Sequence, residues 1–344
     1  MKIALIGCGG VGRAFLRLMG DKSTVRKDGD LKLEVNCILD IGGGIYNPQG
    51  IDCTDVAEFL ETGGRVDGYS KGGSCEIDLE CVLSGSELDM LVELTPTNKE
   101  TGEPGLSHIR RTLKNGLHVV TGNKGPILLA YNELREQAAR MGVQLGIGCT
   151  TGGALPAINA GLIDMAGAEI LSIEGVLNGS TNFILKDMEE TGSDYGKALK
   201  KAQEMGIAET DPSLDVEGWD TASKLLILTN VLMGSSKNLE DVKVQGITAL
   251  TPEDIAAVKK ENKKYKLIGR SQITGEGIIM TVRPEKVGAD HSLYGVDGRN
   301  KAVRYTSSTL GDLTVIGGAS GTLPAAASIY RDIVNIARGY KFSK

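Results

Sequence analysis

The sequence predicts an α/β protein of two domains, an N-terminal one on a doubly wound parallel sheet and a second α+β one. Residues 2–6 form a short apolar run that leads directly into a glycine-rich turn and then a helix. Later apolar runs at 33–40, 89–94 and 117–121 have the length and composition of buried parallel strands. After residue 150 the pattern changes to amphipathic helices and alternating strands. We therefore expect a first domain of residues 1–150 completed by 310–344, and a second of residues 151–309.

The glycine-rich turn has the spacing of a dinucleotide-binding (Rossmann) fingerprint. Gly7 permits the tight turn, Gly9 lets a pyrophosphate approach the backbone, and Gly12 lets the helix pack on the strand. The helix N-terminus adds amide donors for the phosphates. Glycine-rich turns are common, but this one stands between a strand and a helix, which favours a cofactor site that also includes Gly10 and Val11.

Asp40 closes the second predicted strand, where a carboxylate can accept hydrogen bonds from the adenosine ribose. It could instead cap a turn. Residues 41–44 contain no Arg or Lys to meet a 2′-phosphate, which favours NAD over NADP, although Arg65 or Lys71 could fold back toward this position.

Two further strands end in polar residues, Thr95 after 89–94 and Lys124 after 117–121. The carboxyl ends of strands border the ligand crevice in such sheets, so both residues are candidates for the cofactor site. A lysine in a loop is more often simply solvated.

A helix that starts near Asp220 continues through the apolar segment 225–233 and is hydrophobic on nearly every face. Asp220 and Lys224, one turn apart, are therefore expected to face an interior cleft. Burial favours a neutral lysine and nearby carboxylates favour the ammonium, so such a lysine can exchange a proton near neutral pH. The alternative is an ordinary solvated ion pair.

Composition narrows the possible partners and compartment. The net charge of −6 argues against nucleic acid as the main partner. Six cysteines without CxxC spacing and three distant histidines indicate a reducing cytosol and no metal site. The first strand begins at Lys2, which leaves no room for a signal peptide, and no apolar run approaches membrane-spanning length, so we expect a cytoplasmic protein without a membrane partner.

Along nearly its whole length the chain resembles homoserine dehydrogenase. The resemblance lies in the glycine turn and in residues 93–98, 120–124, 177–185 and 208–224. It implies an enzyme of threonine and methionine biosynthesis that reversibly reduces L-aspartate 4-semialdehyde to L-homoserine with NAD(P)H. It also implies a homodimer, with the second domain providing catalysis and the dimer interface.

The resemblance further implies roles for individual residues. Lys224 matches the residue that donates and accepts the proton, and Asp220 matches a residue that lies next to that lysine. Lys124 matches a second lysine near the cofactor and the substrate. The remaining matches are Glu209, Asp215, Asp220, Gly179 and Thr181 around the substrate, and Gly206 and Gly321 at the cofactor.

The sequence departs from the family pattern in three places. Gly148 stands where a glutamate usually accompanies a monovalent cation, so only backbone oxygens of Thr151, Gly153 and Leu155 would remain as ligands. The late glycine loop, residues 317–321, differs from the usual GxGAG-like form. The chain ends near Lys344 without a regulatory domain, from which we expect no feedback inhibition through such a domain.

Two other functions fit parts of the sequence. Cys149 opens a Cys-Thr-Thr run like that around the nucleophile of acylating aldehyde dehydrogenases, but the next histidine is the distant His291. A dinucleotide-binding sensor or scaffold also fits the glycine turn, because a fold alone does not determine chemistry, but a sensor has no reason to keep the set of Glu209, Asp215, Asp220 and Lys224.

Overall fold

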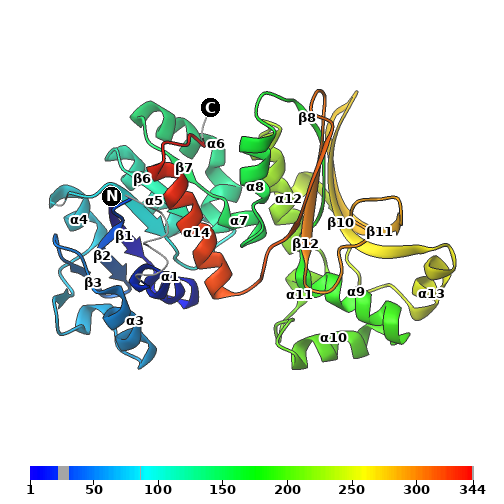
Figure 1. Ribbon diagram of the computed structural model, residues 1–344, viewed down its shortest axis with the longest axis horizontal. Helices are drawn as coiled ribbons and strands as arrows, with labels where there is room; N and C mark the ends of the chain where they lie inside the picture. The colour runs from blue at the N-terminus through cyan, green and yellow to red at the C-terminus, as the bar shows by residue number, and fades with distance from the viewer. Residues whose placement is uncertain (22–30, 86, 343–344) are drawn as a thin grey trace. The chain divides into compact units, whose positions relative to one another are not determined.

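The structure, a computed structural model, describes residues 1–21, 31–85 and 87–342. It consists of two compact units: unit 1 contains Met1–Ala154 and Gly321–Lys344, and unit 2 contains Leu155–Ser320 (Figure 1). The chain returns to unit 1 later than the expected residue 310, because the strand Asp312–Gly317 pairs within the sheet of unit 2.

Unit 1 is built on a seven-stranded sheet with the order β4-β3-β2-β1-β5-β6-β7. Five strands, β2, β1, β5, β6 and β7, run parallel. Beyond β2, β3 pairs with β2 and β4 pairs with β3, both in antiparallel orientation. This is the predicted Rossmann architecture. The strands are β1 (Lys2–Ile6), β2 (Glu34–Asp40), β3 (Gly43–Tyr46), β4 (Gly73–Ser74), β5 (Met90–Glu93), β6 (His118–Thr121) and β7 (Leu145–Gly146).

Helices cover this sheet in two layers (Figure 1). In one layer α1 (Gly10–Gly20) contacts both α3 (Cys53–Glu61) and α14 (Thr322–Ala337). In the other, α5 (Gly105–Lys114) contacts α6 (Lys124–Met141), and α4 (Leu79–Gly85) packs on an apolar cluster of β1, β2 and β5. A short helix α7 (Cys149–Gly152) follows β7. The apolar strand runs are thus buried on both faces, as parallel strands require.

Unit 2 contains a six-stranded sheet with the order β13-β12-β8-β10-β11-β9. All its pairings are antiparallel except that of β9 with β11. The strands are β8 (Ile170–Val176), β9 (Val242–Val244), β10 (Lys263–Thr274), β11 (Gly277–Gly288), β12 (Lys301–Ser307) and β13 (Asp312–Gly317).

One face of this second sheet supports the helices of unit 2. Gly269 of β10 lies under Thr221 and Leu225 of α12, and the hydroxyl of Tyr305 on β12 donates to the carbonyl of Ala157 in α8. The helices are α8 (Ala157–Asn159), α9 (Gly179–Thr191), α10 (Tyr195–Glu204), α11 (Ser213–Val216), α12 (Trp219–Leu232) and α13 (Pro252–Lys260). Among the described residues, no helix has both the length and the apolar composition needed to cross a membrane.

Candidate active site

The glycine turn between β1 and α1 forms an open cradle at a helix N-terminus. At Gly7, an added Cβ would lie 2.6 Å from the backbone of Leu94. At Gly12, it would lie 2.1 Å from the carbonyl oxygen of Gly7. Close packing therefore requires glycine at both positions. At Gly9 an added Cβ would meet no atom within 4 Å, and Gly9 provides no side chain to cap α1. The residues therefore fit a pyrophosphate, which would take its hydrogen bonds from the first amides of α1.

Gly10 and Gly321 belong to neighbouring parts of this cradle. An added Cβ at Gly10 would lie 3.0 Å from the side chain of Thr322, the residue that follows Gly321 at the start of α14. The predicted cofactor residues at the two ends of the chain therefore lie close together. Gly206 lies in unit 2, where it follows α10 with a φ of 64° and is exposed.

A buried carboxyl organises the ends of β5 and β6. Glu93, with 0% exposure, accepts hydrogen bonds from the backbone and hydroxyl of Thr95 and from the hydroxyl of Thr121. Burial raises the pKa of Glu93, and the hydrogen bonds from Thr95 and Thr121 partly offset that rise. Asn123 also donates to Thr95, at 3.4 Å. Glu93 therefore fixes Thr95 beside Gly7, a role that its sequence position alone did not indicate.

Lys124 is the first residue of α6, whereas the sequence placed it in a loop, and α6 has a kink at Ala130, after which its second part begins at Tyr131. The side chain of Asn123 caps the helix by accepting a hydrogen bond from the amide of Gly125. An asparagine before a helix is a common N-cap, so the sequence does contain a signal for this helix start. The signal is hard to recognise because Gly125 and Pro126 follow at once, and these two residues usually indicate a turn. Lys124 is consequently held at a helix start, beside the Thr95 cluster.

Asp40 borders two cavities at the edge of unit 1. One, of about 440 Å³, also contains Cys75, His108 and Arg111 in its lining, and the other, of about 250 Å³, is lined by Arg13 and Arg65. The backbone segment 41–44 has no basic residue, but the fold brings two arginines to Asp40 from elsewhere in the chain. Arg65 lies over Gly42, where an added Cβ would be 2.2 Å from its Nη2 atom.

In unit 2, Asp220 and Lys224 lie on the first turns of α12, as predicted. Lys224 Nζ donates to Asp220 Oδ2 at 2.5 Å and to the carbonyl oxygen of Leu177 at 2.8 Å. The side chains of Lys224 and Asp220 are only 15% and 12% exposed, which rejects a solvated surface pair. Gly218 caps α12 with a φ of 93°, and an added Cβ there would lie 3.1 Å from Val244 and Val282. A glycine is needed there for the close approach that starts this helix.

Asn178 joins the predicted substrate residues to this pair. Its Nδ2 atom donates to Asp215 Oδ1 at 2.8 Å and to Asp220 Oδ2 at 2.9 Å. Its Oδ1 atom accepts from the amide of Thr181 at 2.9 Å and thereby caps α9. The hydroxyl of Thr181 also donates to Asn178, so both donors of Thr181 serve the helix cap. The sequence singled out Asn178 only as a member of the segment 177–185, without a role of its own.

Glu209 and Gly179 lie nearby along the chain but differ in their contacts. The carbonyl oxygen of Glu209 accepts a hydrogen bond from Gln203, and its side chain is exposed. Gly179 is the first residue of α9, and an added Cβ there would lie 3.0 Å from the carbonyl oxygen of Arg299.

Two kinds of ion site were considered in the sequence, one made of side chains and one made of backbone oxygens after Gly148. In the part of the chain that the structure describes, no group of three or more His, Cys, Asp or Glu side chains could hold a metal ion. The amide of Gly148, which replaces the family's glutamate, donates to the buried carboxylate of Asp332 at 2.7 Å. The backbone cation site at Thr151, Gly153 and Leu155 stays a prediction.

Cys149 lies on α7, where its thiol has a hydrogen-bond partner in the backbone of α14. Its thiol donates to the carbonyl oxygen of Ala325 at 3.6 Å, and it lies on the first turn of a four-residue helix. We expect Cys149→Ser to keep catalytic activity within about twofold, because the substitution retains a small hydrogen-bond donor and removes only the thiol chemistry. Steady-state kinetics of the purified variant measure this, and complete loss of activity with intact cofactor binding would contradict it.

The glycine cradle on a parallel sheet and the buried lysine with its carboxylates define the class as a nicotinamide-dependent oxidoreductase. A family model described as homoserine dehydrogenase matches residues 156–334. The homoserine dehydrogenase of Methanocaldococcus jannaschii is 39% identical over 336 residues, 98% of each chain. The chain belongs to the homoserine dehydrogenase family, whose members are NAD(P)-dependent oxidoreductases that act on a CH–OH group.

Other relatives agree in sequence and in structure. An NAD(+)-dependent homoserine dehydrogenase of Pseudomonas canavaninivorans is 35% identical, with 97% of this chain and 96% of that protein covered. The crystal structure of a putative homoserine dehydrogenase from Archaeoglobus fulgidus has a TM-score of 0.86 at 32% identity, covering 98% and 99% of the two chains. A hyperthermophilic archaeal homoserine dehydrogenase mutant in complex with NADPH has a TM-score of 0.84 at 26% identity, covering 100% and 99%.

Proposed function

We propose that the protein interconverts L-homoserine and L-aspartate 4-semialdehyde reversibly with NAD or NADP, and that Lys224 is the proton donor and acceptor. The observation that carries this proposal is the buried ammonium of Lys224 on α12. An ammonium has three N–H donors, and two of them meet Asp220 Oδ2 and the carbonyl oxygen of Leu177. In the described residues no hydrogen bond uses the third, which we assign to the oxygen of the substrate.

Lys224 acts on the oxygen at which charge develops. The nicotinamide, when bound, supplies the hydride in the reductive direction. As negative charge builds on the aldehyde oxygen, the ammonium of Lys224 stabilises that oxygen and then protonates it. Asp220 holds the ammonium in place throughout. In the oxidative direction, neutral Lys224 accepts the proton of the hydroxyl group.

The remaining groups fit the two ends of an amino acid. Asp215, half-buried and oriented by Asn178, is suited to the α-ammonium, and Glu209 would have to turn inward to join it. The N-terminus of α9 at Gly179 is suited to the α-carboxylate, because first-turn amides and the helix dipole favour an anion. Thr181, whose two donors serve Asn178, orients this helix start and contributes no free donor in this structure.

The experiment that tests the proposed function is a spectrophotometric assay with L-homoserine. NAD and NADP are supplied in parallel, and nicotinamide reduction is followed. We expect reduction of at least one cofactor. A protein that binds either cofactor but reduces neither in the presence of homoserine would require a different substrate.

We also infer that the protein accepts NADP beside NAD, because Arg13 and Arg65 line the cavity next to Asp40. The Asp40 carboxylate suits the ribose hydroxyls of NAD, and the guanidinium of Arg65 can form charge-assisted hydrogen bonds with the 2′-phosphate of NADP. Asp67 holds Arg65 in place through two hydrogen bonds, at 3.0 and 3.2 Å. NAD and NADPH are also the cofactors named for the relatives from Pseudomonas canavaninivorans and a hyperthermophilic archaeon.

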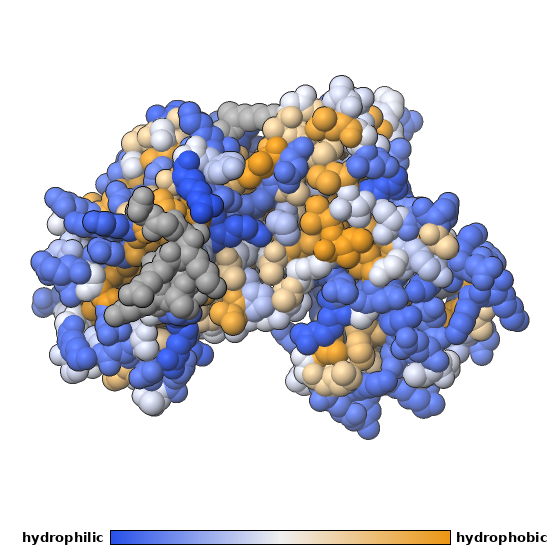
Figure 2. Space-filling view, in the orientation of Figure 1, coloured by the Kyte–Doolittle hydropathy of each residue, from blue (hydrophilic) through white to orange (hydrophobic). Residues whose placement is uncertain are grey.

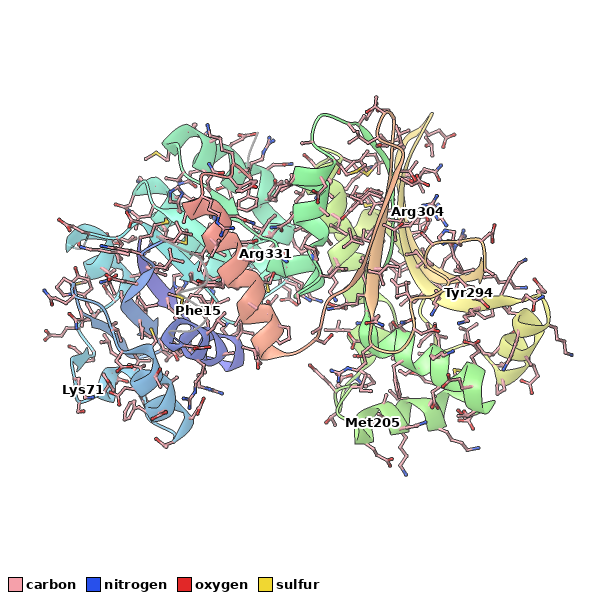
Figure 3. All side chains as sticks on the ribbon, in the orientation of Figure 1. Phe15, Lys71, Met205, Tyr294, Arg304 and Arg331 are labelled. Carbon is pink, nitrogen blue, oxygen red and sulfur yellow. The ribbon has the colours of Figure 1, made fainter. Side chains whose placement is uncertain are left out.

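We expect Arg65→Ala to raise the Kd of NADP about tenfold and to leave the Kd of NAD within about twofold, measured by titration calorimetry. Lys71→Ala is the matched control. Lys71 is as exposed as Arg65, 69% against 67%, but pairs with Asp55 at the periphery of unit 1 (Figure 3). Equal losses for the two cofactors, or equal losses in the two variants, would show a general effect of charge instead of a 2′-phosphate contact.

We propose a homodimer that forms through the face of the second sheet opposite α12. Figure 2 shows hydrophobic residues gathered over the sheet near β12, next to a hydrophilic surface over α13. By strand alternation, the exposed Ile279 and Ile316 share their face with Arg304 (Figure 3), which contacts the buried Glu174 at 3.3 Å. Apolar side chains around a network of mixed charge suit a self-complementary interface.

We expect sedimentation equilibrium at micromolar concentration to give the mass of a dimer. The variant Ile316→Asp should shift it toward the monomer, because each subunit would bury an unpaired charge. A monomeric mass for the unmodified protein would contradict the proposed dimer. We further propose a cytoplasmic location, which the six free cysteines support.

A further inference from the structure

Asn178 is a buried amide that contacts both carboxylates proposed for the substrate site. It is 5% exposed, and its Nδ2 atom reaches Asp215 at 2.8 Å and Asp220 at 2.9 Å. The oxygen that it contacts on Asp220 is Oδ2, the atom that also accepts from Lys224 Nζ. One carboxylate oxygen is therefore held between an amide and an ammonium.

The orientation of this amide is fixed from its other end. Asn178 Oδ1 accepts a hydrogen bond from the amide of Thr181 and caps α9. A flipped amide would direct its oxygen at the two carboxylates and leave the cap without an acceptor. Because the cap and the carboxylates demand opposite ends of the amide, only one orientation satisfies all of these groups.

Two carboxylates that share one donor repel each other less and are held at a fixed separation. We propose that Asn178 is a positioning residue for catalysis, which holds Asp220 against Lys224 and holds Asp215 toward the substrate. This role rests on the proposed function of Lys224. It differs from a simple helix cap, which would require only the Oδ1 atom.

The variant Asn178→Asp separates the two roles. Aspartate caps helices as well as asparagine does, but a carboxylate cannot donate to Asp215 or Asp220 and adds a third negative charge. We expect the variant to keep its Kd for NADH and to lower kcat about tenfold or more. Its melting temperature should fall, because the new carboxylate lies beside the two buried carboxylates of Asp215 and Asp220. The high-pH limit of kcat in the reductive direction should move upward, because an added carboxylate favours the ammonium of Lys224.

A control variant isolates the loss of a cap from the loss of positioning. Asp194 caps α10 by accepting from the amide of Lys197 at 2.9 Å. Asp194→Ala should destabilise unit 2 by the usual cost of a lost cap and leave kcat within about twofold. Should Asn178→Asp fail to fold, Asn178→Ser, which retains a capping oxygen, is measured in its place with the same expected loss of kcat.

A second measurement does not depend on turnover. The pH midpoint for acetylation of Lys224 is followed by mass spectrometry in the free protein, with the exposed Lys197 as internal reference. We expect Asn178→Asp to raise the Lys224 midpoint and leave that of Lys197 unchanged. If the unmodified protein does not oxidise homoserine, the proposed function fails and the catalytic role of Asn178 fails with it; a midpoint that moves then shows only that residue 178 lies beside Lys224. If the protein is active, and the substitution changes neither kcat nor the midpoint, Asn178 is only a helix cap.

Discussion

Lys224→Ala is expected to lower kcat by about 10²- to 10⁴-fold while the Kd values of NAD and NADP stay unchanged. The loss arises because the developing charge on the substrate oxygen meets a methyl group instead of an ammonium. Asp220, 8% exposed, would also lose its ion-pair partner, so we expect a lower melting temperature beside the kinetic loss. Single-turnover kinetics with L-homoserine and calorimetric titration of the cofactor separate the two effects.

The control for Lys224→Ala is another lysine paired with a carboxylate one turn away. Lys200 lies 3.9 Å from Glu204 on α10, and both side chains are mostly exposed. Lys200→Ala should leave kcat and stability nearly unchanged, because such exposed pairs contribute little. Normal turnover by a well-folded Lys224→Ala protein would remove Lys224 from the mechanism.

Two substitutions in the glycine turn should fail in different ways. Gly12→Ala forces a Cβ to 2.1 Å from the carbonyl oxygen of Gly7, so we expect the free energy of unfolding to fall by about 1–3 kcal/mol. Gly9→Ala meets no protein atom within 4 Å, so we expect a nearly unchanged stability. Its added methyl group lies where the pyrophosphate approaches, and the Kd of both cofactors should rise about tenfold to a hundredfold.

Denaturant unfolding and calorimetric titration of the two variants test this contrast. Because the pyrophosphate is common to NAD and NADP, Gly9→Ala should weaken both equally, unlike Arg65→Ala. A Gly9→Ala protein with unchanged affinity for both cofactors would mean that the phosphates do not approach this turn. A Gly12→Ala protein of unchanged stability would mean that α1 can shift away from β1 at little cost.

The fold class could be predicted because local patterns determine most of it. Buried parallel strands give continuous apolar runs, and the strand–glycine turn–helix order at residues 2–16 is specific enough to identify the first βα unit. The apolar residues on nearly every face of α12 likewise predicted that Asp220 and Lys224 lie in the interior. These predictions depend on residues that are neighbours in sequence.

The contacts that complete the site join residues far apart in the chain, and no local pattern encodes them. Arg13 and Arg65 come from two different segments to line one cavity with Asp40, and Asn178 lies 42 positions before its partner Asp220. The donors of Thr181 could not be assigned from the sequence, because a threonine near a helix start serves a cap or a ligand equally well. The roles of the individual site residues remain predictions for the experiments above.

The packing of α14 in unit 1 has a consequence for how the polypeptide emerges during synthesis. Helix α1, near the N-terminus, contacts α14, which begins at Thr322. A ribosome must therefore translate all of unit 2 before the second helical partner of α1 exists, because only α3 is made earlier. Until then the side of α1 that packs against α14 is uncovered (Figure 3). Unit 2, continuous from Leu155 to Ser320, has all of its strands available earlier. Unit 1 is thus the first to begin on the ribosome, but unit 2 is the first to be complete.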